Sequence, residues 1–418
     1  MTDEGEALTV LICSCNMGNA EPTASSFGAW VPDDGDVKAM LLDTLYPVPS
    51  EIVPKNSPSK DAITVGNVPT EPGNFDVIVL GMQEATFDVD SKEMDSDEEA
   101  ASRATEESKK KKKKKTKNPI KKAYKAVVCT TRTLVGSSDN TKEVYSVPEL
   151  RRVINRDADR KSFSYFGDTH ALHGLVKDRC PSYTTIVDYN RGQMRMMILV
   201  KTGLKDQVTD IDVDAENTGL VGVLANKGGI VSSITVRNTR LSFMTAHLEA
   251  HEGGKHYMNR NSNLAEILSG ARVGPGHKYF DASLNSHHAF FCGDLNYRVV
   301  LPEKEIDQEE HKRIVRDMVE KEEWSALNDY DELGQALTKK ECLNGFMTLP
   351  CHFPPTFKVT RQDGYAYNAK RTPSYTDRVL WKSADGFESN LSPICYEPCP
   401  DFITSDHKPF WCALKLEM

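Results

Sequence analysis

Three short segments toward the C-terminal end of the chain combine carboxylate, amide and imidazole side chains with adjacent apolar runs. They are residues 291–298 (FCGDLNYR), 373–381 (PSYTDRVLW) and 405–409 (SDHKP). Polar side chains directly beside apolar runs are typical of loops that follow buried strands, where catalytic groups are often presented. Together the three segments indicate a metal-assisted, phosphate-hydrolysing site.

Asp294 and Asn296 lie two positions apart, so on an extended segment both side chains point to the same side. In that arrangement the carboxylate can take a proton from water while the amide holds the water or a phosphate. A turn that closes a strand would explain residues 293–296 taken alone. The apolar run at 289–292 before them favours the functional interpretation.

His407 lies between Asp406 and Lys408, so a carboxylate close to its imidazole raises its affinity for a proton. A protonated imidazole there would stabilise negative charge on phosphoryl oxygens. A lone histidine is usually structural, but two further residues supply what a catalytic pair needs. Asp377 is a candidate to orient His407, and His247 at the end of a predicted strand is a second donor.

Two residues nearer the N-terminus offer oxygen ligands for a metal ion. Mg²⁺ takes oxygen ligands, usually one or two of them carboxylates, and keeps water or substrate phosphate in its other positions. Asn16 and Glu84 each follow a predicted strand and can supply such oxygens. Taken singly, Asn16 is typical of a turn and Glu84 of a cap. The prediction of a Mg²⁺ site therefore depends on the presence of the later motifs in the same chain.

An anionic substrate requires a local cationic pocket, because the chain carries a formal net charge of -9. Residues 226–229 (NKGG) form a turn signal between apolar strands, and Lys227 at its tip is a candidate clamp for an anionic group. Lys358 and Lys370 flank a polar loop ahead of the segment 373–381. They would attract phosphate strongly if that loop leans over the site.

Short apolar segments with polar residues after them predict several buried strands. They cover residues 8–13, 75–80, 193–200, 219–224, 229–236, 241–246, 289–292, 379–380 and 410–416. Residues 302–323 predict a helix, with a proline at the start and acidic residues in the first turn. A second, weaker helical pattern covers residues 259–269. We expect packed sheets with helices outside.

Residues 88–120 interrupt this pattern with an acidic run followed by seven consecutive lysines, Lys109 to Lys115. Almost no apolar residue lies among them, which is typical of a disordered surface insertion. A solvated loop is the plainest interpretation. A nuclear-import patch and an electrostatic tether to anionic lipid are the alternatives, and the sequence alone does not choose between them.

Composition narrows the class of protein. A hydrophobic fraction of 39% and a charged fraction of 27% are those of an ordinary globular protein. The net charge argues against broad nucleic-acid binding, which needs a basic footprint. No apolar stretch approaches the length of a membrane span, so any membrane contact is expected to be peripheral. The ten scattered cysteines predict reduced thiols in a cytoplasmic or nuclear protein.

These motifs, in this order, make the chain resemble the inositol polyphosphate 5-phosphatases of the endonuclease/exonuclease/phosphatase superfamily. The residues that carry the resemblance run over nearly the whole chain. They are residues 16–18, 83–84, 226–229, 247–248, 260–261, 293–298, 355–358, 373–381 and 405–409. The resemblance implies one catalytic domain over residues 1–418, folded as a four-layer α/β sandwich of two mixed sheets with helices outside.

The resemblance also implies roles for individual residues. Mg²⁺ is held chiefly at the positions of Glu84 and Asn16, with Asp406 close to the metal. The equivalents of Asp294 and Asn296 activate and hold water.

The implied phosphate contacts come from residues matching His247 and His407, with Asp377 orienting the latter. Lys358 and Lys370 match residues that engage the neighbouring 4-phosphate. The full set that we assign to substrate binding is Asn226, Lys227, Arg298, Lys358, Lys370, Arg371 and Arg378.

Two residues depart from the family pattern. Phe357 stands where relatives commonly carry a tyrosine that touches the 4-phosphate, and Cys15 replaces an aromatic residue ahead of Asn16. The implied substrate is a phosphoinositide or a soluble inositol polyphosphate, met at an anionic membrane surface in the first case. A phosphodiesterase of the same superfamily, a nuclease or sphingomyelinase, is the alternative. A non-catalytic lipid-binding scaffold is a third, disfavoured because a binder needs no water activator.

Overall fold

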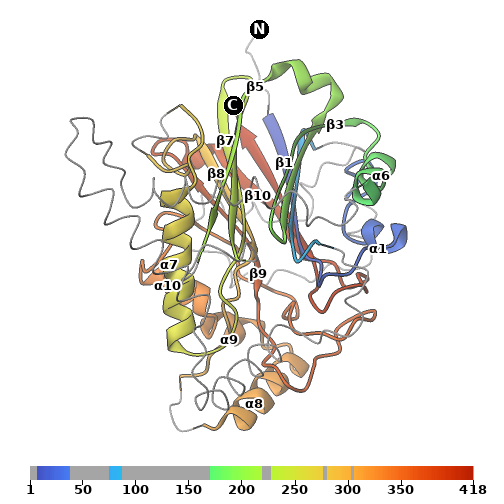
Figure 1. Cartoon of the computed structure of the whole chain (residues 1–418). Coiled ribbons are helices and arrows are strands. Elements are labelled where there is room, and N and C mark those ends of the chain that lie inside the picture. The colour runs from blue at the N-terminus through green and yellow to red at the C-terminus, as the bar shows by residue number, and fades with distance from the viewer. Residues whose placement is uncertain are drawn as a thin grey trace, which may run out of the picture. The chain divides into compact units, whose positions relative to one another are not determined.

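The computed structural model describes residues 7–37, 75–86, 170–218, 227–275, 280–302 and 306–417. Two β-sheets pack face to face in this part of the chain (Figure 1). The six-stranded sheet has the order β10-β11-β1-β2-β4-β3 and the five-stranded sheet the order β5-β6-β7-β8-β9. The predicted strand at 219–224 and the predicted insertion at 88–120 lie outside the described residues.

The first sheet consists of β1 (Ala7–Asn16), β2 (Val77–Gln83), β3 (Tyr183–Arg191), β4 (Met194–Lys201), β10 (Leu391–Pro398) and β11 (Phe410–Glu417). The second consists of β5 (Val208–Asn217), β6 (Gly228–Val236), β7 (Thr239–His247), β8 (His288–Asp294) and β9 (Asp377–Ser383). The pairs β1–β2 and β7–β8 are parallel and the other neighbouring pairs are antiparallel, so both sheets are mixed.

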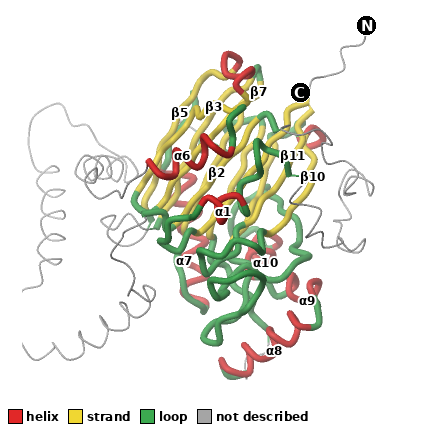
Figure 2. The backbone as a smooth tube through the Cα atoms, turned by 90° about the vertical axis from the view of Figure 1, so that its right-hand side faces the viewer, coloured by secondary structure: helices red, strands yellow, loops and turns green. Residues whose placement is uncertain are grey.

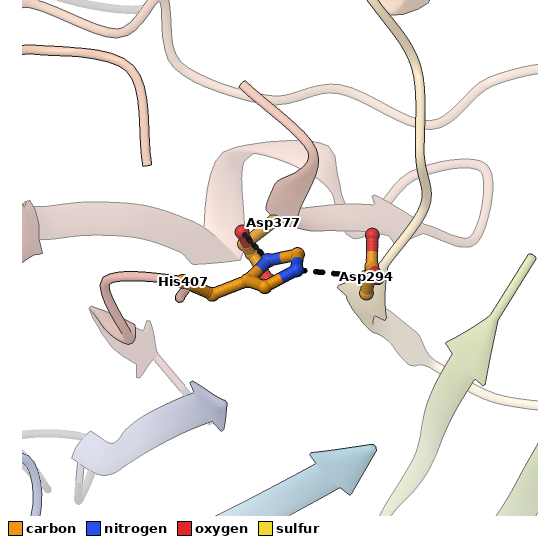
Figure 3. Close-up of side chains that lie close together, drawn as sticks. All are labelled: Asp294, Asp377 and His407. Carbon is orange, nitrogen blue, oxygen red and sulfur yellow. Dashed lines mark hydrogen bonds and ion pairs between the residues drawn. The ribbon is translucent and has the colours of Figure 1, made fainter. Parts of the chain in front are cut away.

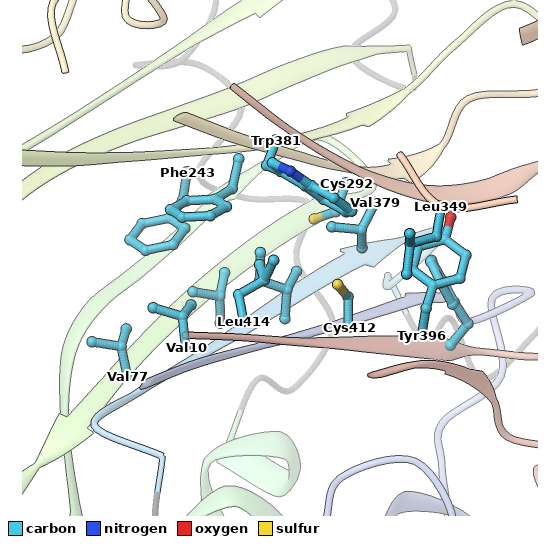
Figure 4. Close-up of a cluster of buried hydrophobic side chains, with 14 of the residues drawn as sticks. Val10, Val77, Phe243, Cys292, Leu349, Val379, Trp381, Tyr396, Cys412 and Leu414 are labelled. Atoms are coloured by element: carbon cyan, nitrogen blue, oxygen red, sulfur yellow. The ribbon is translucent and has the colours of Figure 1, made fainter. Parts of the chain in front are cut away.

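The central core lies between the sheets and explains the continuous apolar runs of the inner strands. In β1, Val10 and Ile12 face the opposite sheet, while Leu11 and Cys13 face outward into a second apolar cluster. Successive side chains of a strand point to opposite faces, so a strand covered on both sides is apolar throughout. Figure 4 shows the inner cluster, where Trp381 and Phe243 of one sheet meet Leu414 of the other.

Helices cover the outer faces of both sheets. The helices α1 (Ala24–Gly28) and α6 (His170–Arg179) cover the six-stranded sheet, as Figure 2 shows, with Leu172 and Val176 in the second cluster. On the five-stranded sheet, α7 (Gly254–Gly270) and α10 (Glu332–Thr338) contribute Leu264, Ile267 and Leu333 to a third cluster. The layers are therefore helix, sheet, sheet, helix, which confirms the predicted four-layer sandwich.

The predicted helix at 302–323 starts later than expected. It is α8 (Gln308–Glu320), and α9 (Trp324–Asp329) follows it. Asp307 caps α8 by accepting hydrogen bonds from the backbone N–H groups of Glu309 and Glu310. Both α8 and α9 lie at the end of the sandwich where β1 ends and β11 begins (Figure 1).

Two further features of the described residues concern their cysteines and their helices. The nine cysteines among them are free, and eight of these are buried. Within the described ranges, no helix combines the length and the apolar character that crossing a membrane requires.

Candidate active site

The topology brings the motif residues to one edge of the two sheets. The parallel strands β1 and β2 end there at Asn16 and Gln83, and the parallel strands β7 and β8 end at His247 and Asp294. Antiparallel β9 and β11 begin at the same edge, where Asp377 pairs with Asp294 and Phe410 pairs with Ser14. Side chains from segments far apart in the sequence therefore meet at this edge.

Asp294 is the buried centre of the site. Its Oδ2 accepts a hydrogen bond from Asn16 Nδ2 at 3.0 Å and lies 3.2 Å from His247 Nε2. Burial alone would raise the pKa of Asp294, but the nearby His407, His247 and Lys227 outweigh it and hold the pKa below its usual value. The carboxylate is therefore ionised at neutral pH.

Gly293 is required just before Asp294. Its φ of +132° lies in a region that favours glycine, and a Cβ there would come within 2.1 Å of the Ala246 carbonyl oxygen. The close approach of β7 to β8 at this point places His247 beside Asp294.

His407 is oriented by Asp377 (Figure 3). Its Nδ1 lies 2.9 Å from Asp377 Oδ2, and the hydroxyls of Thr356 and Thr376 donate to the same oxygen at 2.8 and 2.9 Å. His407 Nε2 then faces Asp294 Oδ2 at 4.0 Å. Burial would lower the pKa of His407, but the Asp377 and Asp294 carboxylates outweigh burial and raise it to about 9. The imidazole is therefore protonated at neutral pH.

Asn296 is held by Arg298 rather than left to rotate. Arg298 donates to the backbone oxygen of Asn296 at 3.0 Å and to its Oδ1 at 2.8 Å. Asn296 Nδ2 in turn donates to the Leu248 carbonyl at 3.2 Å. The substrate-binding role predicted for Arg298 receives no support from these contacts, since they make it a support for Asn296.

Phe357 packs between two groups of the site. Its ring centroid lies 4.6 Å from that of His407 and 4.8 Å from the guanidinium carbon of Arg298. A phenylalanine at this position therefore serves the packing of both residues.

The residues predicted to hold a metal occupy the same edge. Glu84 Oε1 lies 3.8 Å from His247 Nε2, the nitrogen that also contacts Asp294. Asn16 Oδ1 accepts one hydrogen bond, from Gly18 N at 3.0 Å, and an amide oxygen has a second lone pair. A carboxylate and an amide oxygen beside a buried carboxylate suit a hard divalent cation.

Two other groups bear on where a cation would bind. Asp406 forms an ion pair with Lys358 Nζ at 2.9 Å, so its predicted role as a ligand stays a prediction. Asp294, Asp377 and His407 bring ligand atoms within 4.8 Å of one another. An imidazole already bonded to Asp377 suits Mg²⁺ less well than the oxygens of Glu84 and Asn16.

The other cations that we assigned to substrate binding lie in different surroundings. Lys227 Nζ contacts His247 Nε2 directly, which places it in the site. Lys370 is exposed and Arg371 half-buried, both beyond Lys358 in the same loop. Asn226 lies outside the described residues.

Arg378 is not brought together with this cluster. It follows Asp377 on β9 and points to the opposite face, where its Nη1 lies 2.6 Å from Asp331 Oδ2. Both side chains are 2% exposed. This pairing gives no support to a substrate contact for Arg378 and makes it a structural residue.

Glu332 carried no recognisable signal in the sequence, although its partners Arg260 and Arg298 lie within the motifs. Glu332 Oε2 accepts hydrogen bonds from Arg260 Nη2 at 2.5 Å and from Arg298 N at 2.9 Å. Tyr297 donates its hydroxyl to Asn261 Oδ1 at 2.5 Å. These bonds tie the 296–298 loop to α7 and α10.

Lys408 also proves to be a support. Its Nζ donates to the carbonyls of Gln362, Pro400 and Phe402 at 2.7, 2.6 and 2.9 Å. Burial lowers the pKa of Lys408 to about 8. The Lys408 side chain therefore joins two loops, and it takes no part in the contact between His407 and Asp294.

Comparison with known proteins shows the family to which the chain belongs. Residues 16–412 match the profile of Endonuclease/Exonuclease/phosphatase family 2, and the chain belongs to this family. Phosphatidylinositol 3,4,5-trisphosphate 5-phosphatase 2B of Danio rerio is 29% identical over 249 residues, covering 56% of this chain and 19% of the relative. The Homo sapiens phosphatidylinositol 3,4,5-trisphosphate 5-phosphatase 1 is 28% identical over 255 residues, covering 58% and 20%.

The chain spans about one fifth of the length of these curated relatives. Their names confirm the resemblance to inositol 5-phosphatases that the motifs indicated.

Solved structures share the fold. The inositol polyphosphate 5-phosphatase domain of SPsynaptojanin, in complex with inositol (1,4)-bisphosphate and calcium ion, has a TM-score of 0.58 at 19% identity. The match covers 99% of this chain and 85% of that one. A Cimex nitrophorin ferrous NO complex has a TM-score of 0.54 at 16% identity, with 99% of each chain covered.

Proposed function

We propose that this chain is a Mg²⁺-dependent phosphomonoesterase that removes the 5-phosphate from an inositol ring. The substrates are phosphatidylinositol 4,5-bisphosphate or 3,4,5-trisphosphate, and soluble inositol polyphosphates are further candidates. The observation that carries the proposal is the convergence of His247, the His407–Asp377 pair and the buried Asp294 carboxylate. The 5-phosphatase names of the relatives support the substrate class.

Each of the buried residues of the site has a separate role in the proposed reaction. Asp294 accepts a proton from the attacking water, and Asn296, fixed by Arg298, holds that water in line. As the water oxygen bonds to phosphorus, the bond between phosphorus and the inositol oxygen breaks, and that oxygen takes up one proton to leave as a hydroxyl. His247 and protonated His407 donate hydrogen bonds to the phosphoryl oxygens as negative charge grows on them. Because Asp377 already orients His407, little reorganisation of this donor is needed when the charge develops.

Glu84 and Asn16 would hold Mg²⁺, with Asp406 as a further candidate ligand. A bound Mg²⁺ supplies Lewis-acid stabilisation of charge on the phosphoryl oxygens.

A panel of phosphoinositides and soluble inositol phosphates tests the proposal. We expect inorganic phosphate to be released from substrates that carry a 5-phosphate, with release lost in EDTA and restored by excess Mg²⁺. Cleavage of diesters without phosphate release would indicate the phosphodiesterase instead. Binding of phosphoinositide vesicles without any turnover would indicate the scaffold.

The pH dependence of the reaction tests the His407–Asp377 pair. Because the carboxylate raises the imidazole pKa to about 9, the protonated donor is present below that pH and is lost above it. Asp377→Asn removes the negative charge, so we expect the alkaline limb of the kcat profile to move to lower pH by about one unit or more. The exposed Asp385 on the following loop offers a matched Asp385→Asn control, whose profile should stay in place. An unshifted limb in Asp377→Asn would contradict the assignment.

Peripheral contact with an anionic membrane is part of the proposal for lipid substrates, as is a cytoplasmic or nuclear location. The Lys109–Lys115 run is the candidate determinant. Deletion of residues 88–120 is expected to leave turnover of a soluble substrate intact and to weaken vesicle binding.

A further inference from the structure

The segment 355–371 carries Lys358 and Lys370, which the family resemblance assigns to the phosphate next to the scissile one. Val359 pairs with Tyr367 in an antiparallel bridge, and the Tyr367 hydroxyl donates to the Pro355 carbonyl at 2.8 Å. Lys358 therefore lies on one arm of a short hairpin, and Lys370 follows the other arm. The position of each lysine depends on how this hairpin is held.

Asn368 connects the two lysines through its backbone and its side chain. Its N–H donates to the Lys358 carbonyl at 2.8 Å, and its Oδ1 accepts from the backbone N–H of Lys370 at 2.9 Å. A displacement of Asn368 would thus move the backbone at both lysines together.

Arg316 of α8 binds the backbone carbonyl groups of the residues around Lys370. Its Nη2 donates to the carbonyls of Asn368 at 3.0 Å and Ala369 at 2.8 Å, with the Arg371 carbonyl at 3.4 Å. These residues flank Lys370 on both sides. The Arg316 guanidinium therefore binds the backbone on both sides of Lys370 and does not contact the catalytic residues.

A cavity of about 460 Å³ lies beside these hydrogen bonds, between α8 and the hairpin. It is lined in part by Arg316, Val319, Trp324, Pro354, Tyr365 and Tyr367. Where a cavity separates two segments, side-chain packing contributes less to their relative position. The hydrogen bonds from Arg316 to the hairpin therefore contribute a larger share of what fixes the hairpin relative to α8.

We propose that Arg316 is a positioning residue that sets the affinity for the phosphate adjacent to the scissile one. This inference rests on the proposed function, because it assumes that Lys358 and Lys370 bind that phosphate. An ordered lysine binds an anion more tightly than one that must first be immobilised. The guanidinium orders the backbone of residues 368–371 before substrate arrives. Its loss should therefore weaken binding and leave the chemical step unchanged.

Steady-state kinetics on two short-chain lipids test the inference in the full chain. Arg316→Met keeps the length of the side chain but removes the donors. We expect KM for phosphatidylinositol 4,5-bisphosphate to rise about tenfold, with kcat changed less than about twofold. KM for phosphatidylinositol 5-phosphate, which lacks the adjacent phosphate, should stay at the wild-type value. Arg316→Lys keeps the charge with fewer donors in a different geometry, and an intermediate KM is expected.

Arg313 provides a matched control on the same helix. It is exposed and pairs with Glu310 at 2.6 Å, and Arg313→Met should change neither KM. A merely structural role for Arg316 would instead lower the melting temperature and affect both lipids equally. Equal KM changes for the two lipids, or none, would overturn the inference.

Amide hydrogen exchange gives a second readout that does not depend on turnover. Residues 366–371 should exchange about tenfold faster in Arg316→Met than in wild type or Arg313→Met, because their carbonyls lose a partner. Unchanged exchange would overturn the inference even if KM moved. If the wild-type chain releases no phosphate from either lipid, the proposed function fails. If turnover is normal and the variants match the wild type, only the inference fails.

Discussion

Asp294→Ala is expected to lower kcat for phosphate release by about a thousandfold or more. The substitution removes the proposed acceptor of the water proton and the carboxylate that His247, His407 and Asn16 all face. Loss of this group also lets the pKa of His407 fall, since Asp294 is one of the charges that raise it. Because the attacking water loses its proton acceptor outright, we expect the effect to exceed that of any single histidine.

The measurement is phosphate release from phosphatidylinositol 4,5-bisphosphate at saturating Mg²⁺, alongside binding of the same lipid to each variant. Substrate binding should be retained, because the phosphate donors His247 and His407 remain. Asp385→Ala, on an exposed loop, controls for general effects of removing a carboxylate. Turnover of Asp294→Ala near the wild-type rate would show that another group activates the water.

The meeting of the motifs at one edge could be predicted from the sequence in part. Asn16 and Glu84 follow apolar runs that form one parallel pair, and His247 and Asp294 end a second parallel pair in the other sheet. Parallel strands present their ends at a common edge of their sheet. What the sequence did not reveal is that β9 and β11 run the other way. Their first residues, rather than their last, therefore reach the site. Strand direction depends on pairing between distant segments and leaves no local signal.

The sequence alone was enough to predict that the Arg378 side chain points away from the site. Asp377 and Arg378 are adjacent residues of one strand, so only one of the two can face the site. The assignment of Asp377 to His407 therefore excluded Arg378, and the structure places it against Asp331. The partners themselves lie 47 positions apart, and nothing in the local pattern identifies such a pair.

Lys408 and Arg298 show a different limit. A cation inside a motif that also carries catalytic side chains suggests an electrostatic role in the site. Each instead binds backbone carbonyls, which need donors wherever loops are buried. Which loops are buried follows from tertiary packing, so these roles appear only in the folded chain.

The fold does not decide the chemistry. A Cimex nitrophorin, whose solved structure is a ferrous NO complex, shares the sandwich with a TM-score of 0.54. The proposal of phosphate hydrolysis depends instead on the buried Asp294 and the oriented His407, because function resides in such sites.

Arg378→Met is expected to lower the free energy of unfolding by about 3–5 kcal/mol, since it leaves the buried Asp331 carboxylate without its cation. Asp331 Oδ2 keeps a single hydrogen bond from Gly334 N at 3.0 Å, at the start of α10. Chemical denaturation followed by circular dichroism measures the change. Arg313→Met, which breaks an exposed pair on α8, should leave the denaturation midpoint in place.

A second substitution separates the charge from the packing. Asparagine at position 331 removes the unpaired charge yet still caps α10, since asparagine is among the best N-cap residues. The double variant Arg378→Met with Asp331→Asn should therefore recover much of the stability lost in Arg378→Met. The folded fraction of both variants should keep the wild-type KM, because the Arg378 guanidinium lies on the face of β9 opposite to Asp377. A raised KM with unchanged stability would return Arg378 to the substrate site.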